Sequence, residues 1–157
     1  MSFLDASLDH LDEVVTAMDR LAAEQRGWIN LVPAHAEREQ LAAVRSVPGM
    51  IFGRIGGRGS PDPKITWTAP SPSRRRVEPA QLGIEHPAGP KARRQLDDAG
   101  HPIPRGWTLL QDHPLRGLVV VPRPEVDHRE QIRWALRAGE LLVRGERMLW
   151  QGQVFEG

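Results

Sequence analysis

The sequence predicts an α+β protein in which an antiparallel β-sheet is flanked by N-terminal and C-terminal amphipathic helices, with a small extra helix between them. Apolar residues recur on one side of two long segments near the chain ends, as in surface helices. Short alternating or β-branched runs lie between these segments and are typical of strands. Most connections between the strands are short, which favours antiparallel pairing with the helices on one face.

The first helix is predicted to begin near the N-terminus and to end at Gly27, a residue common at helix ends. Ser2 and Asp5 fit a capping box at its start. Apolar residues at alternating spacings of four and three form its inner stripe, namely Leu4, Leu8, Leu11, Val15, Met18 and Ala22. The opposite side is acidic, so this helix should pack by one side only.

The middle of the chain is predicted to alternate between strands and loops. Strands are expected over residues 28–32, 64–68 and 80–86, with Ile65, Trp67, Leu82 and Ile84 pointing into the core. A short helix over 34–47 and a strand over 50–55 are also expected. Glycine and proline concentrate in two segments, about 49–63 and 69–79, which are predicted to be flexible loops.

The small extra helix is predicted over residues 90–99, with proline at its first position and Gly100 at its end. Strands at 107–111 and 117–122 should form a hairpin through the loop 112–116.

The C-terminal helix should begin at a second capping box, formed by Asp127 and Glu130. Its inner stripe is predicted to consist of Ile132, Ala135, Leu136, Gly139, Leu142 and Val143. A last strand is expected over 148–155. The whole chain, 1–157, is expected to form one α+β domain, because its length is typical of one and no boundary interrupts it.

Composition excludes several classes of site. The chain has 157 residues and no cysteine, so disulfides, thiolate nucleophiles and cysteine-ligated zinc or iron–sulfur centres are absent. No apolar run approaches the length of a membrane span, and the N-terminus lacks the basic and apolar regions of a signal peptide. We therefore expect a cytoplasmic protein that makes no membrane contact.

Charge is distributed unevenly although the formal net charge is only +1. Residues 1–26 carry six acidic and two basic residues, whereas residues 54–94 carry nine basic and three acidic ones. Such asymmetry indicates either an anionic partner or two faces of one domain that attract each other.

The basic middle region supplies the candidate anion-binding residues, namely Arg74, Arg75, Arg76, Lys91, Arg93 and Arg94. Nucleic-acid-binding proteins usually add exposed aromatic residues or a reading helix to such a charge patch. Only Trp67 lies within this region, and its alternation with Ile65 predicts burial. An exposed basic loop is therefore the favoured interpretation.

Catalytic and metal-binding signatures are weak. The glycine-rich stretch 49–59 lacks the lysine followed by serine or threonine that a P-loop needs. His86, His101 and His113 could form a zinc site with Asp112 only if the fold brings them together. A turn explains 112–117 more simply, because aspartate, proline and glycine all favour turns. No catalytic residue, metal or cofactor is predicted.

One part of the chain resembles a known group of domains. The resemblance rests on the strand Leu82-Gly83-Ile84-Glu85-His86, a short helix from Leu96 to Ala99-Gly100, the pattern Pro104-x-Gly106-Trp107, a hairpin and the amphipathic helix 132–143. In these features, residues 81–143 resemble bacterial domains related to type III secretion chaperones and YbjN-like proteins. The resemblance implies terminal helices flanking an antiparallel sheet, a protein-interaction or chaperone-like role, and no catalytic residues.

These observations favour a non-enzymatic protein-interaction or chaperone-like accessory module. It would bind another protein or a second copy of itself through an apolar helix face or a sheet face, with Trp134 and Trp150 as candidate interaction residues. Two alternatives stay open. One is a nucleic-acid-binding accessory protein that uses the basic region 54–94, and the other is a small enzyme with a loop-based histidine and aspartate site.

Overall fold

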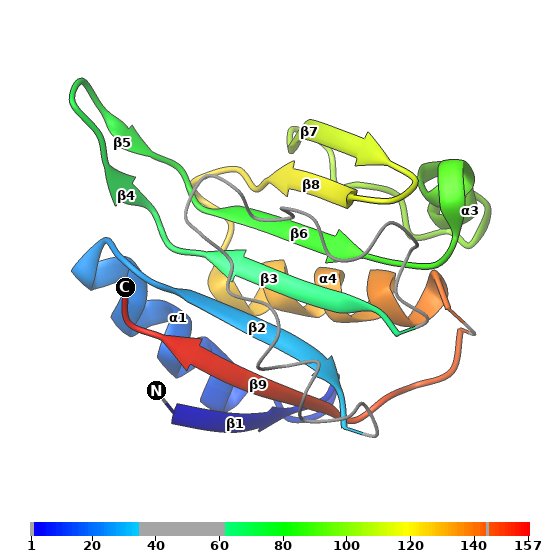
Figure 1. The fold of residues 1–157 in the computed structure, drawn as a ribbon, viewed down its shortest axis with the longest axis horizontal. Helices are drawn as coiled ribbons and strands as arrows, with labels where there is room; N and C mark the ends of the chain where they lie inside the picture. The colour runs from blue at the N-terminus through cyan, green and yellow to red at the C-terminus, as the bar shows by residue number, and fades with distance from the viewer. Residues whose placement is uncertain (1, 35–61, 144) are drawn as a thin grey trace.

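The computed structural model describes residues 2–34, 62–143 and 145–157. It has an α+β fold, in which helices α1, α3 and α4 pack against a seven-stranded antiparallel sheet of strand order β1-β9-β2-β3-β6-β8-β7 (Figure 1). The predicted helix 34–47 and strand 50–55 lie almost wholly outside the described residues. The elements in chain order are β1 (Ser2–Ala6), α1 (Asp12–Glu24), β2 (Trp28–Pro33), β3 (Lys64–Thr68), β4 (Ser71–Pro72), β5 (Val77–Glu78), β6 (Gln81–Glu85), the 3₁₀ turn η1 (Gly89–Lys91), α3 (Ala92–Asp98), β7 (Thr108–His113), β8 (Gly117–Val121), α4 (His128–Leu141) and β9 (Trp150–Phe155).

The N-terminal segment is a strand, so the prediction that the first helix begins there, with a capping box of Ser2 and Asp5, is wrong. Residues 2–6 form β1, which pairs antiparallel with β9, and Leu4 lies opposite Gly152. Helix α1 begins only at Asp12. Its fully buried side is also rotated from the predicted stripe, and consists of Val14, Ala17, Met18 and Leu21. The spacing of Leu4, Leu8 and Leu11 fits a helix but also permits a strand followed by a turn.

The central strands were predicted correctly. β3 lies between β2 and β6, and Ile65 faces Ile84 across the β3–β6 pair. Ile65, Trp67, Leu82 and Ile84 are all at most 1% exposed. The segment 69–79, predicted as a loop, contains the short ribbon β4–β5, which projects from the sheet (Figure 1).

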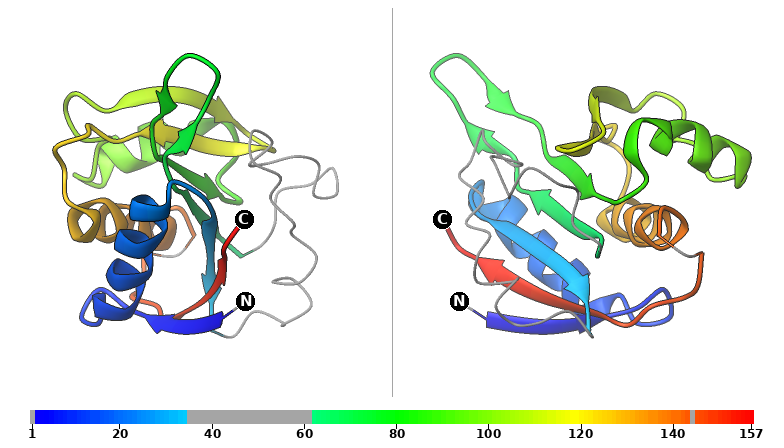
Figure 2. Two further views of the ribbon diagram at one scale, coloured as in Figure 1. Left: turned by 90° about the vertical axis from the view of Figure 1, so that its left-hand side faces the viewer. Right: turned by 45° about the vertical axis from the view of Figure 1, so that its right-hand side comes forward.

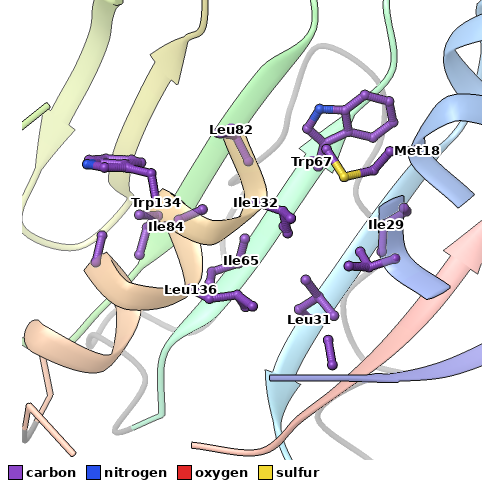
Figure 3. Packing of buried hydrophobic residues seen from close by; sticks show 14 of the residues in the cluster. Met18, Ile29, Leu31, Ile65, Trp67, Leu82, Ile84, Ile132, Trp134 and Leu136 are labelled. Carbon is purple, nitrogen blue, oxygen red and sulfur yellow. The ribbon is translucent and has the colours of Figure 1, made fainter. Parts of the chain in front are cut away.

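Helix α4 follows its sequence prediction closely. The side chain of Asp127 accepts a hydrogen bond from the backbone N–H of Glu130 at 2.7 Å, which is the N-cap half of the predicted capping box. Figure 2 shows α1 and α4 on the same face of the sheet. In Figure 3, Ile132 and Leu136 of α4 lie over Ile65 of β3, while Met18 of α1 covers Trp67. Each helix in the described ranges is too short or too polar to cross a membrane.

Ion pairs join α1 to the C-terminal part of the chain. Asp12 pairs with Arg129, and Asp19 Oδ1 lies 2.6 Å from Nδ1 of His128. Arg147 lies 3.3 Å from Asp9. The acidic N-terminal region is thus met in part by basic residues of α4 and of the segment before β9.

The sheet face that points away from α1 and α4 carries buried polar residues. Lys64 Nζ on β3 lies 3.4 Å from Glu85 Oε2 on β6, and the two side chains are 5% and 10% exposed. Nearby, the Thr66 hydroxyl donates to Asn30 Oδ1 at 2.9 Å. Burial lowers the pKa of Lys64 and raises the pKa of Glu85, and the attraction between them opposes both shifts. The alternation of β3 predicted this outward face, but not that it would be buried.

Candidate anion-binding pocket

The six predicted anion-binding residues are not brought together by the fold. Arg74, Arg75 and Arg76 lie at the tip of the β4–β5 ribbon, where Arg76 Nε bonds Glu78 at 3.1 Å. The other three, Lys91, Arg93 and Arg94, lie on η1 and α3. Figure 1 places the ribbon and α3 at opposite ends of the sheet. All six side chains are exposed, and their role in anion binding stays a prediction.

The two tryptophans predicted to contact a partner have different surroundings. Trp150 is 1% exposed, its ring lies against Gly139, and its Nε1 lies 3.4 Å from Glu140 Oε2. So little of the Trp150 ring is accessible that the main contribution of this side chain is to the core. Trp134 is 6% exposed and lines a cavity of about 390 Å³ beside α4.

Three chain segments form this cavity, which we call the arginine pocket. The loop before β7 contributes Arg105, the segment after β8 contributes Arg123, and α4 contributes Glu130 and Arg133. Three guanidinium groups against one carboxylate leave a formal surplus of two positive charges on its walls. Guanidinium groups bind carboxylates and phosphates through charge-assisted hydrogen bonds, so the pocket suits an anion.

Aromatic rings form the floor of the arginine pocket. His101 stacks on Trp134 with ring centroids 5.6 Å apart and an interplanar angle of 11°. Trp107 meets Trp134 edge to face, at 5.3 Å and 66°. The Nε1 of Trp134 donates to the carbonyl of Pro102 at 3.0 Å, and Nε2 of His101 donates to the carbonyl of Trp134 at 2.9 Å. These bonds and ring contacts fix the orientation of Trp134 and His101 in the pocket wall.

The three arginines differ in their partners. Arg123 packs over Gly106, where an added Cβ would lie 2.5 Å from Cδ of Arg123. Its Nε also donates a hydrogen bond to Glu125 at 2.7 Å. Arg105 and Arg133 form no ion pair with any residue that the structure describes, and neither does Glu130. Other described arginines differ in the same respect, since Arg129 and Arg147 form ion pairs whereas Arg75 and Arg93 form none with a described residue. Like the arginines of the β4–β5 ribbon, Arg105, Glu130 and Arg133 are exposed to solvent, so their charges are available to a ligand.

A larger cavity, of about 590 Å³, lies between β1, the start of α1 and β9. Its walls include Asp5, Asp12 and Glu13. Two of these carboxylates are already engaged, because Asp12 pairs with Arg129 and Glu13 Oε2 accepts from the Asp5 N–H at 3.4 Å. The arginine pocket is the better candidate, since more of its charge is unmatched.

The histidines considered for zinc do not converge. His101 belongs to the arginine pocket, whereas His113 caps the β7–β8 turn by accepting from the N–H groups of Leu115 and Arg116, both at 3.1 Å. This matches the interpretation of 112–117 as a turn. His86 is 2% exposed, and burial lowers its pKa while the charge of Asp112 opposes that shift. Within the described part of the chain, no three histidine or acidic residues are grouped to hold a metal.

Sequence reasoning did not find Arg105, Arg123 and Arg133. Each is a single arginine in its own segment, and no motif or spacing links the three. The sequence feature that could have pointed to the pocket is its pair of tryptophans. Trp107 and Trp134 each lie within two residues of one of these arginines. Comparisons with protein-family models, curated proteins and solved structures found no match to this chain, so the role of the pocket is argued from its own geometry.

Proposed function

We propose that the protein is a non-enzymatic interaction module that holds an acidic segment of a partner protein in the arginine pocket. The observation that carries this proposal is the pair Arg105 and Arg133, whose guanidinium groups meet no carboxylate in the described structure yet line one aromatic-floored cavity. Three guanidinium groups line this one cavity, so a carboxylate there can accept charge-assisted hydrogen bonds from more than one arginine.

The floor of the arginine pocket favours a carboxylate over a nucleic-acid base. Single-stranded nucleic acids bind largely by stacking bases on aromatic faces. Trp107 and Trp134 are only 9% and 6% exposed, and their rings pack against each other and against His101. Little ring face is left for a base, whereas a glutamate or aspartate side chain needs only the guanidinium groups.

The experiment measures binding of a fluorescein-labelled peptide that contains two adjacent glutamates, with the matching glutamine peptide as ligand control. The test variant is Arg105→Gln/Arg133→Gln. The matched control is Arg75→Gln/Arg93→Gln, which removes the same charge from the exposed residues outside the pocket. Charge-assisted hydrogen bonds contribute about 1.5–3 kcal/mol each. Loss of two is therefore expected to raise the Kd by about 100-fold or more, while the control variant stays within about threefold.

Three results would contradict the proposal. These are equal binding of both peptides by the wild-type protein, equal loss of affinity in the two double variants, and binding of a single-stranded DNA but of neither peptide. In the last case, loss of DNA binding in an Arg74→Ser/Arg75→Ser/Arg76→Ser variant would identify the alternative, a nucleic-acid-binding protein. Such binding should also weaken steeply with salt, because each phosphate contact releases a counterion.

A further inference from the structure

We infer that the arginine pocket recognises an ammonium group next to the ligand's carboxylate, and that Glu130 is the residue that distinguishes this ligand from a simple anion. The inference rests on the proposed function of the pocket. Glu130 lines the same cavity as Arg105 and Arg133, and its carboxylate forms no ion pair with the described residues. The cavity therefore offers unmatched charges of both signs.

Helix α4 holds the two opposite charges in a fixed relation. The backbone N–H of Glu130 is bound to Asp127 at 2.7 Å, which fixes this residue in the first turn of the helix. Arg133 follows one turn later, and residues three apart on a helix have Cβ atoms about 5–6 Å apart. Farther along α4, Arg137 and Glu140 have the same spacing and do pair, at 3.2 Å. Glu130 and Arg133 form no such pair, although both line one cavity.

The chemistry of the pocket follows from this arrangement. A ligand that carried only a carboxylate would bind the arginines but would be repelled by Glu130, since like charges at short range are unfavourable. A ligand whose primary ammonium reaches Glu130 while its carboxylate binds the arginines would satisfy Arg105, Arg133 and Glu130 together. An amino-terminal glutamate or aspartate of a partner chain has this chemistry, and so does an internal acidic residue beside a lysine.

The experiment uses isothermal titration calorimetry with four peptides on the full chain. The first pair is Glu-Ala-Ala-Ala with a free or an acetylated amino terminus. The second pair is acetylated Glu-Lys-Ala-Ala and acetylated Glu-norleucine-Ala-Ala, and all four carry a carboxamide at the C-terminus. We expect the ammonium-bearing member of at least one pair to bind the wild-type protein about 10-fold more tightly than its neutral partner. The pair that shows the difference tells whether the ammonium belongs to the amino terminus or to the lysine.

Glu130→Gln is the decisive variant, because glutamine keeps the backbone N–H that bonds Asp127 and removes only the charge. In this variant the difference within each pair should fall to about twofold, and the neutral peptides should bind as tightly as before or more tightly. If the wild-type protein binds all four peptides equally and the Arg105→Gln/Arg133→Gln variant loses them all, the inference is overturned while the proposed function stands. If the wild-type protein binds none of the four, both are overturned.

Discussion

Replacing Glu85 with alanine is expected to lower the free energy of unfolding by about 3–5 kcal/mol, as for other broken buried ion pairs. Lys64 and Glu85 lie 3.4 Å apart, with side chains only 5% and 10% exposed. Removing the carboxylate leaves the ammonium of Lys64 buried without this counter-charge. Urea denaturation at pH 7 measures the effect, and a loss below about 1 kcal/mol would contradict this account of the pair.

The control for Glu85→Ala is the double variant Lys64→Met/Glu85→Leu, which removes both charges and keeps similar volume. It should unfold at a urea concentration close to that of the wild-type protein or higher, because replacing a buried ion pair with apolar residues is often neutral or stabilising. A double variant as unstable as Glu85→Ala would show that the polar pair is needed for the fold itself.

The pH dependence of the Glu85→Ala variant follows from the pKa of Lys64. Burial already lowers this pKa from its usual 10.5, and the attraction to Glu85, which opposes that shift, is lost in the variant. The folded variant therefore binds fewer protons than its unfolded chain as the pH rises toward 10.5, and its stability should increase over that window. The deficit relative to the wild-type protein should shrink in the same direction. A deficit that grew with pH would contradict this assignment.

Replacing Gly117 with alanine is expected to cost about 2–6 kcal/mol, which combines left-handed backbone strain of about 1–3 kcal/mol with overpacking of similar size. Gly117 begins β8 with φ of +86°, and an added Cβ would lie 2.3 Å from the carbonyl oxygen of Ile84. This oxygen belongs to the backbone of the neighbouring strand β6, so the contact can be relieved only by moving a sheet strand.

The variant Gly100→Ala separates the cost of left-handed backbone strain from the cost of steric overlap. Gly100 has φ of +71°, but no atom lies within 4 Å of the position that its Cβ would occupy. Its replacement should cost only the strain, about 1–3 kcal/mol. Thermal or urea unfolding of both variants checks the difference. Equal losses at the two glycines would mean that β6 and β8 do not approach as closely as described.

Most of the fold that could be predicted from the sequence was predicted from local patterns within single elements. The capping box of Asp127 and the stripe through Ile132 and Leu136 lie within one helix, so α4 could be predicted without knowing its neighbours. β1 could not, because Leu4 fits both a strand and the stripe of a helix. Its strand conformation depends on pairing with β9, at the other end of the chain. Likewise, nothing local indicates that β9 lies between β1 and β2.

The candidate site was harder to predict than the fold. The arginine triplet at 74–76 is conspicuous in the sequence, but neighbouring like charges repel one another and these side chains lie in solvent at the tip of the β4–β5 ribbon. The arginines of the pocket come from the loop before β7, the segment after β8 and helix α4. They meet only in the fold, where Trp134 of α4 packs against Trp107 just before β7, so no single segment contains the site.

NMR titration with the peptide that contains two adjacent glutamates tests the central claim most directly. The Nε–H signals of the arginines report contact with an anion at individual side chains. We predict that the signals of Arg105 and Arg133 shift in proportion to the bound fraction, together with the indole N–H of Trp134, while those of Arg75 and Arg93 stay unchanged. Shifts confined to the β4–β5 ribbon or to α3, with none in the arginine pocket, would contradict the account.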